Sequence, residues 1–111
     1  MIVTRSGRAT GRVQGVMFRQ TFVRALQKRA LKGGASNARH RRDEVTFTAE
    51  GEAAAVEELI HKMGSGRPLN SWGARVEAVE ILDEVIPIER HQVTTVNVDD
   101  FAWSPGVEFY L

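Results

Sequence analysis

The stretch of sequence that decides this fold joins an extended segment to a helix and reads GRVQGVMFR, from Gly11 to Arg19. The residues before it, Met1 to Thr10, favour a weak first strand. After it, Phe18, Phe22 and Leu26 recur at i, i+4 and i+8, while charged residues between them can face water, which predicts a helix. The quoted stretch is therefore a loop that leads from a strand into the first turn of a helix.

This loop has the composition of an anion-binding site. Its two glycines, four residues apart, let backbone amides turn inward and approach a ligand closely. Residues 12–17 include no Ser, Thr, Asp or Asn, so the first amides of the helix have no obvious side-chain acceptor and an oxyanion would satisfy them. Arg19 in the first turn is disfavoured by the helix dipole by about 0.3–1 kcal/mol unless an anion lies beside it. Its planar guanidinium binds phosphate oxygens bidentately.

From these residues alone a structural interpretation stays equally open. A glycine-containing turn followed by a helix with a surface arginine has the same composition. The loop also lacks the Gly-Lys-Ser/Thr ending of a Walker P-loop, so it indicates no nucleotide-binding motif.

The rest of the chain alternates strand-like and helix-like segments. The elements predicted after the first strand are a helix over Phe18–Ala30 ended by Lys32-Gly33-Gly34, strands over Gly34–Asn37 and Val45–Ala49, a helix over Glu52–Met63 and a strand over Ala74–Leu82. The alternation slips near Ala78, where we expect a β-bulge or a late start. This order, βαββαβ, predicts a ferredoxin-like α+β sandwich, an antiparallel sheet with two helices on one face.

The C-terminal part is less regular. Asp83–Pro105 contains one further strand-like run, Val93–Val98, and a structureless loop of this length would be unusual in so small a domain. We therefore expect a C-terminal extra strand or hairpin. A last strand should lie near Val107–Leu111, or alternatively near Phe101–Trp103. We expect residues 1–111 to form a single domain with an atypical insertion at about 83–105.

Composition excludes several classes of protein. The chain has 111 residues, a formal net charge of +1 and no cysteine, which removes disulfides, zinc thiolates and thiol nucleophiles. The near-neutral charge gives no bulk case for nucleic-acid or membrane binding. The first residues have too few consecutive apolar positions for a signal peptide, and no window is long enough to span a bilayer. We expect a cytoplasmic monomer.

The quoted stretch resembles the acylphosphatase signature almost position for position, with differences only at Arg12 and Met17, where that signature is loose. The resemblance continues over about the first four-fifths of the chain. Its further matching positions are Leu31-Lys32-Gly33, Asn37, Val45 through Gly51, and Ala74-Arg75-Val76.

The resemblance implies an enzyme that hydrolyses the carboxyl–phosphate bond of acyl phosphates to a carboxylate and inorganic phosphate. It implies a catalytic arginine at Arg19 and an asparagine at Asn37 that holds the attacking water. The phosphate-binding loop would be the backbone of Val13, Gln14, Gly15, Val16, Met17 and Phe18. No metal ion and no cofactor is implied. The expected ligands are a small acyl phosphate and, as product or inhibitor, inorganic phosphate or sulfate.

The sequence departs from the family before and after Asn37. The family usually has Gly-Trp-Val-Arg-Asn where this chain has Gly33-Gly34-Ala35-Ser36-Asn37, and glycine weakens a strand interior. The next turn, Ala38–Asp43, is about two residues longer and lacks glycine. Its arginines at 39, 41 and 42 are interpreted as solvated turn charges, or alternatively as groups that steer an anionic substrate.

Two other functions stay open. A catalytically impaired module could bind phosphate or a phosphorylated ligand without turnover, if Asn37 is held less firmly. A nucleic-acid-binding sheet is disfavoured because the strands lack interleaved aromatic and basic residues. Trp72 and Trp103 are expected to be packing groups. The three histidines, His40, His61 and His91, are expected at the surface or its boundary rather than in catalysis.

Overall fold

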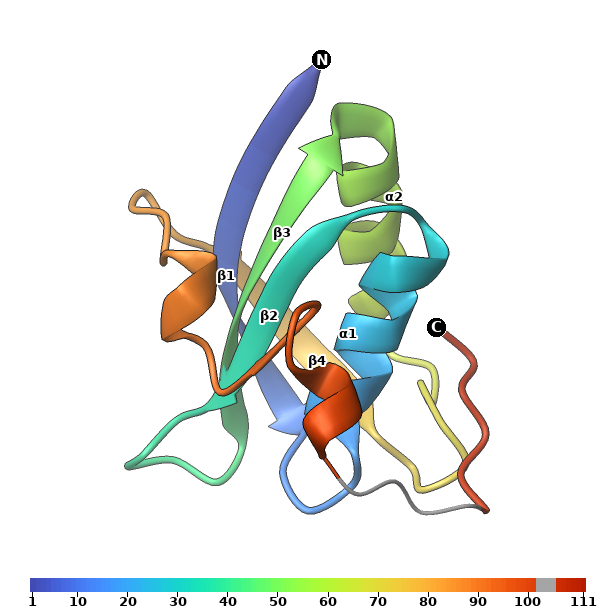
Figure 1. Ribbon diagram of the computed structural model, residues 1–111. Helices are drawn as coiled ribbons and strands as arrows, with labels where there is room; N and C mark the ends of the chain where they lie inside the picture. Colours follow the sequence, from blue (N-terminus) through green and yellow to red (C-terminus); the bar gives the residue numbers. More distant parts are fainter. Residues whose placement is uncertain (102–105) are drawn as a thin grey trace.

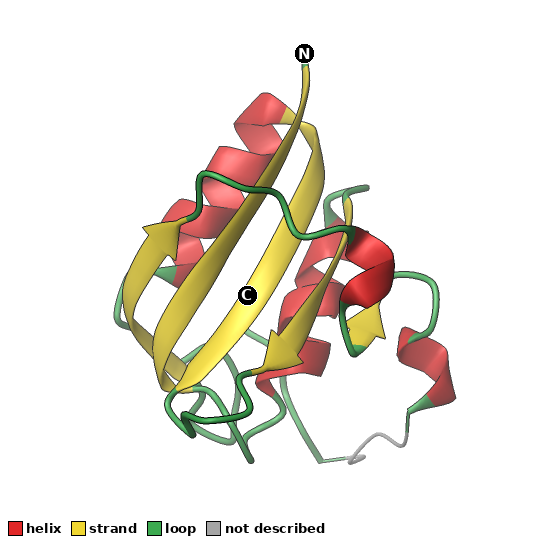
Figure 2. Ribbon diagram, turned by 90° about the vertical axis from the view of Figure 1, so that its left-hand side faces the viewer, coloured by secondary structure: helices red, strands yellow, loops and turns green. Residues whose placement is uncertain are grey.

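In the computed structural model, which describes residues 1–101 and 106–111, the chain forms a five-stranded antiparallel sheet with helices packed on it (Figure 1). The strands are β1 (Ile2–Arg12), β2 (Lys32–Asn37), β3 (Glu44–Glu52), β4 (Arg75–Ile81) and β5 (Val93–Thr94). Across the sheet they lie in the order β4-β1-β3-β2-β5. Helices α1 (Phe18–Lys28) and α2 (Ala53–Met63) lie on the same face of the sheet (Figures 1 and 2). The predicted ferredoxin-like α+β sandwich is confirmed.

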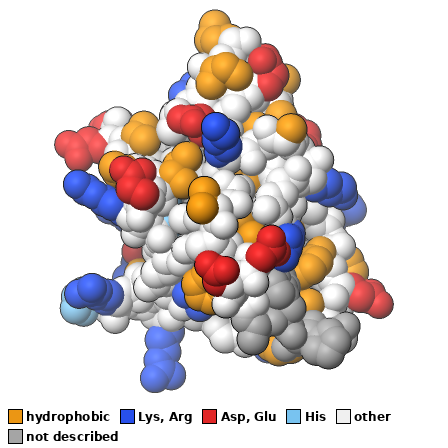
Figure 3. Space-filling view, viewed as in Figure 1, with side chains coloured by type: hydrophobic (Ala, Val, Ile, Leu, Met, Phe, Trp, Pro, Cys, Tyr) orange, Lys and Arg blue, Asp and Glu red, His pale blue; other side chains and the backbone are white. Residues whose placement is uncertain are grey.

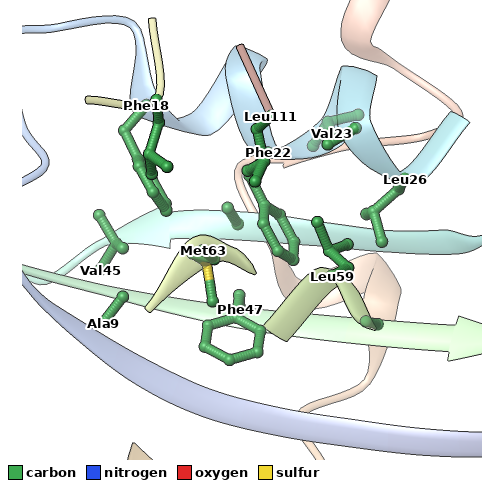
Figure 4. Close-up of a cluster of buried hydrophobic side chains, with 14 of the residues drawn as sticks. Ala9, Phe18, Phe22, Val23, Leu26, Val45, Phe47, Leu59, Met63 and Leu111 are labelled. Atoms are coloured by element: carbon green, nitrogen blue, oxygen red, sulfur yellow. The ribbon is translucent and has the colours of Figure 1, made fainter. Parts of the chain in front are cut away.

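Alternation along the strands turns one set of side chains toward the helices, and these form the core (Figure 4). Phe22 of α1 and Phe47 of β3 meet there with ring centroids 5.2 Å apart. The apolar side chains from the helices and central strands that are at most 1% exposed include Ala9, Phe18, Phe22, Leu26, Val45, Phe47, Ala49, Val56, Leu59 and Met63. Burying a side chain such as Phe or Leu stabilises by about 1.5–3 kcal/mol, so this core fixes both helices on one face.

The bulge expected near Ala78 is present in β4. Thr10 pairs with Ala78 and Gly11 pairs with Val76, which leaves Glu77 as the extra residue. The β4 strand thus has one residue more than β1 between these two pairs. This bulge lies where β1 enters the glycine-containing loop.

Helix α1 ends at Lys28, earlier than predicted. The chain turns at Ala30, whose φ of 58° is left-handed. The amide of Ala30 donates to the carbonyl of Gln27, and the amide of Leu31 donates to that of Leu26, the pattern of a Schellman motif. The prediction ran to Ala30 because glycine usually takes the left-handed position, and the first glycines after the helix are at 33 and 34.

Residues 83–98, which we call the crossing segment, follow β4; the first part runs over the face of the sheet opposite the helices, and the later part includes β5 at the edge of the sheet. Figure 2 shows the chain after β4 passing in front of the strands, with α1 and α2 behind them. The segment contains the short 3₁₀-helix η1 (Ile88–Arg90) and the strand β5, and it leads into η2 (Val98–Asp100). The predicted extra strand is therefore present, but only over Val93–Thr94.

A polar network fastens the crossing segment to the sheet. The hydroxyl of Thr48 donates to the carbonyl of Ile86 at 2.8 Å, and the Ser6 hydroxyl lies 2.7 Å from that of Thr48. His91 contacts Thr48 through Nε2 at 2.8 Å and Ser36 through Nδ1 at 3.0 Å. Because Thr48 uses its proton on Ile86, the network is satisfied by a neutral His91 that carries its proton on Nε2.

His91 is therefore not the surface or boundary residue that we expected. Its side chain is 5% exposed, and burial lowers its pKa to about 4. The sequence prediction failed because a polar residue near turn-forming neighbours usually faces water, whereas here both ring nitrogens find hydroxyl partners from the sheet. His40 and His61 are exposed, as expected.

Gly34 lies directly under the crossing segment. A Cβ at this position would be 2.7 Å from Cβ of His91 and 2.8 Å from the carbonyl oxygen of Val93. Strand β5 pairs with β2 through Gly34–Thr94 and Ala35–Val93, so β2 is an interior strand between β3 and β5. Glycine at this position accommodates the close approach of a second backbone.

The predicted last strand over Val107–Leu111 is not formed. In that stretch Phe109 makes an isolated bridge with Asn70, and the amide of Tyr110 donates to the carbonyl of Leu69. The alternative, Phe101–Trp103, extends into residues outside the described part of the chain; Phe101 itself lies in a bend. No helix within residues 1–101 and 106–111 has the length and apolarity to cross a bilayer.

The buried His91 gives a testable pH dependence. Its pKa is about 4 in the folded protein and about 6.5 in an unfolded chain, so between these values the unfolded state binds more protons. The free energy of unfolding should fall as the pH is lowered from 7 to 4, with up to about 3 kcal/mol due to His91. Urea titrations at several pH values should give a flatter profile for His91→Gln, which does not titrate. Parallel profiles for the two proteins would contradict this role of His91.

Candidate functional site

In the loop between β1 and α1, buried valines alternate with residues whose backbone is left-handed. Val13 and Val16 are 1% and 6% exposed and anchor it in the core. Gly15 between them has a φ of 75°, and Met17, at the N-cap of α1, has a φ of 62°. No side chain caps the helix, and its first turn contains no acidic residue. The amides that start α1 therefore have no side-chain acceptor, as the composition predicted, and this end of the helix dipole is open to an anion.

The side chain of Gln14 ties this loop to the turn after β2. Its Nε2 lies 2.8 Å from the carbonyl oxygen of Arg41 and 2.9 Å from that of Glu44. A backbone bond from the amide of Gly11, near the end of β1, to the carbonyl of Asp43 adds a further connection. The loop and the turn are thus held as one unit, although they are remote in sequence.

Asn70, which no sequence pattern marked, holds the other side of the loop. Its side chain is 1% exposed, and its Nδ2 donates to the carbonyl of Val16 and to Oγ1 of Thr21, both at 2.8 Å. Its Oδ1 accepts from the amides of Trp72 at 2.9 Å and Ala74 at 3.2 Å. These bonds join the loop, the first turns of α1 and the turn before β4. The bonds to Trp72 and Ala74 are local, but the contacts of Asn70 with the loop and α1 are 54 and 49 positions away, so no local signal could have linked Asn70 to the loop.

Arg19 and Asn37 reach the same pocket. This pocket has a volume of about 200 Å³, the liquid volume of six or seven water molecules, which suits a small anion and a water. Its lining consists of Val13, Gly15, Met17, Phe18, Arg19, Gln20, Asn37 and Trp72. The structure therefore brings together Arg19, Asn37 and four of the six predicted loop residues, whereas Gln14 and Val16 of the predicted loop do not line the pocket.

Arg19 is half-buried at this pocket. Burial lowers the pKa of Arg19 below its ordinary value, because a poorly solvated site disfavours the charged form. Its Nη1 donates to Oε1 of Gln92 at 2.8 Å. Within residues 1–101 and 106–111, no carboxylate forms an ion pair with Arg19. A poorly solvated cation with no carboxylate partner attracts an anion more strongly than a solvated one does.

Asn37 stands at the end of β2. Its backbone amide donates to Oε1 of Gln92 at 2.9 Å. The side-chain oxygen Oδ1 is buried and has no hydrogen-bond partner among the described residues. Buried polar atoms are nearly always paired in folded proteins, so an orphaned acceptor at a pocket indicates a place for a donor such as water.

The turn after β2 carries less free charge than its composition suggests. Arg41 forms ion pairs with Asp43 at 3.0 Å and Glu44 at 3.4 Å, and its guanidinium lowers the pKa of Asp43. These partners favour the interpretation of Arg41 as a solvated turn charge, since its field is largely compensated within the turn.

Trp72 is not the packing group that we expected. It is 41% exposed and lines the pocket. The bond from its amide to the buried Asn70 explains this position, because the backbone is fixed while the indole is left outside the core. Trp103, for which the same expectation was made, lies outside the described residues.

An antiparallel sheet with helices on one face, and an uncapped loop that leads into an arginine-bearing helix, define a small α+β sandwich with a candidate anion site. The acylphosphatase family model matches residues 6–98, and this chain belongs to the acylphosphatase family. The match ends at Val98, within the stretch 83–105 for which the sequence predicts an atypical insertion.

Individual proteins agree with this assignment. An acylphosphatase of Rubrobacter xylanophilus is 40% identical over 75 residues, which are 68% of this chain and 63% of that protein. The match therefore spans less than two thirds of the relative's own length. The crystal structure of the Bacillus subtilis acylphosphatase is similar with a TM-score of 0.60 and 27% identity over 74% of this chain and 83% of that one. An acylphosphatase structure from Coxiella burnetii gives a TM-score of 0.62 and 26% identity over 83% and 88%.

The junction at Asn70 can be tested by mutation. Asn70→Ala should lower the free energy of unfolding by about 2–4 kcal/mol, because it leaves buried amides and a buried carbonyl without partners. It should also weaken the binding of inorganic phosphate, since the loop loses its support. Asn70→Asp, which keeps an acceptor but loses the two donors, is the matched control and should be intermediate. Urea unfolding and calorimetric phosphate titration measure both effects; an Ala variant within about 0.5 kcal/mol of the parent would refute the role.

Proposed function

We propose that this chain is an acylphosphatase that hydrolyses the carboxyl–phosphate bond of acyl phosphates, yielding a carboxylate and inorganic phosphate without a metal ion. The observation that carries the proposal is the convergence of three groups at one small pocket. Among residues 1–101 and 106–111, the start of α1 has no side-chain cap, the half-buried Arg19 has no carboxylate partner and the amide oxygen of Asn37 has no hydrogen-bond partner. Membership of the acylphosphatase family supports the proposal.

In this proposal the loop and Arg19 bind the phosphoryl group. Backbone amides from Val13 to Phe18 donate to its oxygens, and the guanidinium of Arg19 adds a charge-assisted contact. Phosphoryl transfer needs positioning and charge stabilisation more than covalent chemistry from the protein. Donors that are already oriented stabilise the charge that spreads over the equatorial oxygens without reorganising during the reaction.

Asn37 orients the water that attacks phosphorus. Its free Oδ1 accepts one O–H of the water and holds the oxygen in line with the departing carboxylate. As the water oxygen bonds to phosphorus, one of its two protons stays on that oxygen and the other passes to a phosphate oxygen. A carboxylate is a good leaving group, so no strong general acid is required.

The alternative is a module that binds phosphate without turnover. This alternative arises because Gly33 to Ser36, the residues before Asn37, include glycines that weaken a strand interior. The structure gives those residues firm neighbours: Ser36 bonds to His91 and to the amide of Gln92, and β5 pairs with Gly34 and Ala35. Support on both edges of β2 favours the enzyme over the impaired module.

The proposed ligands are small. The pocket of about 200 Å³ suits an acyl phosphate, with inorganic phosphate or sulfate as product or inhibitor. Acidic and basic side chains are interspersed over the face in Figure 3, which agrees with the net charge of +1 and gives no basic stripe for nucleic acid. We also propose that the chain acts as a monomer in the cytoplasm, as expected from its sequence.

The acyl group extends, in this proposal, toward Trp72. Trp72 is 41% exposed and lines the pocket, and Met17 and Val13 add apolar lining. Aromatic acyl groups can stack on the indole of Trp72, whereas an acetyl group is too small to cover its face.

The catalytic assignment predicts a defined pattern of activity. Wild-type protein should hydrolyse benzoyl phosphate in the presence of a chelator. Arg19→Ala should lower kcat/KM by at least about 10³-fold and Asn37→Ala by about 10²-fold, because they remove charge stabilisation and water positioning respectively. Lys28→Ala, which removes an exposed cation from the same helix, is the matched control and should be unchanged.

These assays separate the two candidate functions. Circular dichroism confirms that each variant is folded, and absorbance follows the loss of benzoyl phosphate. A folded wild type that binds phosphate but hydrolyses nothing above background would favour the binding module. A wild type that does neither would exclude both.

The role of Trp72 predicts a change of selectivity. Trp72→Ala should lower the ratio of kcat/KM for benzoyl phosphate to that for acetyl phosphate by about 5–10-fold, in line with the energy of one aromatic contact. The inhibition constant of inorganic phosphate should change little, and Trp72→Phe should retain most of the selectivity. Equal losses on both substrates would show that Trp72 supports the loop rather than the acyl group.

A further inference from the structure

Gln92 of the crossing segment touches both residues of the proposed catalytic pair. Its Oε1 accepts from Nη1 of Arg19 at 2.8 Å and from the backbone amide of Asn37 at 2.9 Å. These partners are 73 and 55 positions away in sequence. One oxygen atom thus connects the start of α1, the end of β2 and the crossing segment.

The position of this oxygen is fixed although the side chain is exposed. The backbone amide of Gln92 donates to Oγ of Ser36 at 2.9 Å, and its carbonyl accepts from Nδ2 of Asn97 at 3.3 Å. Its two neighbours in the chain, His91 and Val93, are 5% and 0% exposed. The residue is therefore held at its backbone from both sides, and its side chain reaches across to Arg19 from a rigid base.

The chemistry of the contact suits an arginine that must bind an anion. A carboxylate in this place would pair with the guanidinium and compensate its charge. The neutral amide of Gln92 engages one N–H at Nη1 and leaves the net positive charge uncompensated, with further N–H groups available to a ligand. A free arginine side chain has many rotamers, and a single fixed acceptor restricts them.

Resting on the proposed function, we propose that Gln92 is a positioning residue of the active site. It orients the guanidinium of Arg19 over the pocket and couples that orientation to the backbone of Asn37, so that the phosphoryl-binding and water-binding groups keep a fixed separation. The neutrality of its side chain is part of the role, because it preserves the affinity of Arg19 for the phosphoryl oxygens. The crossing segment is accordingly a part of the site and not only a cover for the sheet.

Two substitutions separate positioning from simple structural support. Gln92→Ala removes the acceptor and should lower kcat for benzoyl phosphate by about 5–20-fold, with the inhibition constant of inorganic phosphate raised by about 2–5-fold. Gln92→Glu keeps the shape and the acceptor but adds a charge. It should raise the inhibition constant of phosphate by about tenfold or more, beyond the effect of Ala, while thermal stability stays near that of the parent. A purely structural role predicts the opposite order, with Glu milder than Ala.

The matched control is Gln27→Ala. Gln27 accepts from Nη1 of Arg24 at 3.0 Å, so it is a second glutamine that contacts an arginine of α1, but it does not line the pocket. Its removal should leave kcat and the phosphate inhibition constant within about twofold of the parent.

A measurement that needs no turnover keeps this proposal separate from the proposed function. In ¹⁵N spectra of the guanidinium groups, the Nη signals of Arg19 should be distinct in the parent, because the bond to Gln92 slows rotation, and should coalesce in Gln92→Ala. Coalescence, together with weaker phosphate binding in Gln92→Glu, would support positioning even if no acyl phosphate were hydrolysed. Unchanged Arg19 signals in the Ala variant, or parental phosphate affinity in the Glu variant, would overturn the proposal.

Discussion

The side-chain amide of Asn70 makes all of its hydrogen bonds inside the protein, and the geometry of the pocket depends on them. Two donors bind the loop and α1, and two acceptor contacts bind the turn that carries Trp72. A buried amide that lost any of these partners would be destabilising by about 1–3 kcal/mol, so the four contacts form or fail together. This interdependence makes one residue outside the family motif responsible for the shape of the site that the motif forms.

The two faces of the sheet are stabilised by different physics. On the helix side, large apolar side chains interdigitate, and burial from water dominates. On the other side, hydroxyls of Ser36 and Thr48 bond to a buried neutral histidine of the crossing segment, and the hydroxyl of Ser6 bonds to that of Thr48. Such a network is stabilising only when every member is paired, because a buried polar group without a partner is costly. The second face thus requires a particular alignment of the crossing segment, and that alignment carries Gln92 to the pocket.

The pocket departs from the rule of satisfied polar groups that the rest of the fold obeys. Asn37 keeps an orphaned oxygen, Arg19 has no carboxylate partner within the described residues, and α1 begins without a cap. Each is mildly unfavourable in the free protein and each would be relieved by the same ligand, a phosphoryl group with an attending water. Conflicts between local rules and the observed structure concentrate at functional sites, and here they coincide in one pocket.

Local sequence patterns predicted the order of elements, the one-sided core, the bulge at β4 and the stretch from Gly11 to Arg19, because helical and strand periods and glycine positions act over a few residues. They also marked Arg19, whose residue type suits an oxyanion, whereas Asn37 was marked only by the resemblance to the acylphosphatase family. The helix end at Lys28 was missed, because Ala30, a non-glycine residue, took a left-handed conformation that only the following chain makes favourable.

The sequence by itself therefore determined the architecture and the residue types of an anion site. Only the tertiary structure decided that His91 is buried, that Trp72 lines the pocket, and that Asn70 and Gln92 join it to distant strands. The roles of His91, Asn70 and Gln92 rest on hydrogen bonds to partners that are remote along the chain, which have no periodic or compositional signature, and Trp72 is placed by its bond to Asn70. Such bonds exist only once the sheet has brought its strands, its loops and the crossing segment together.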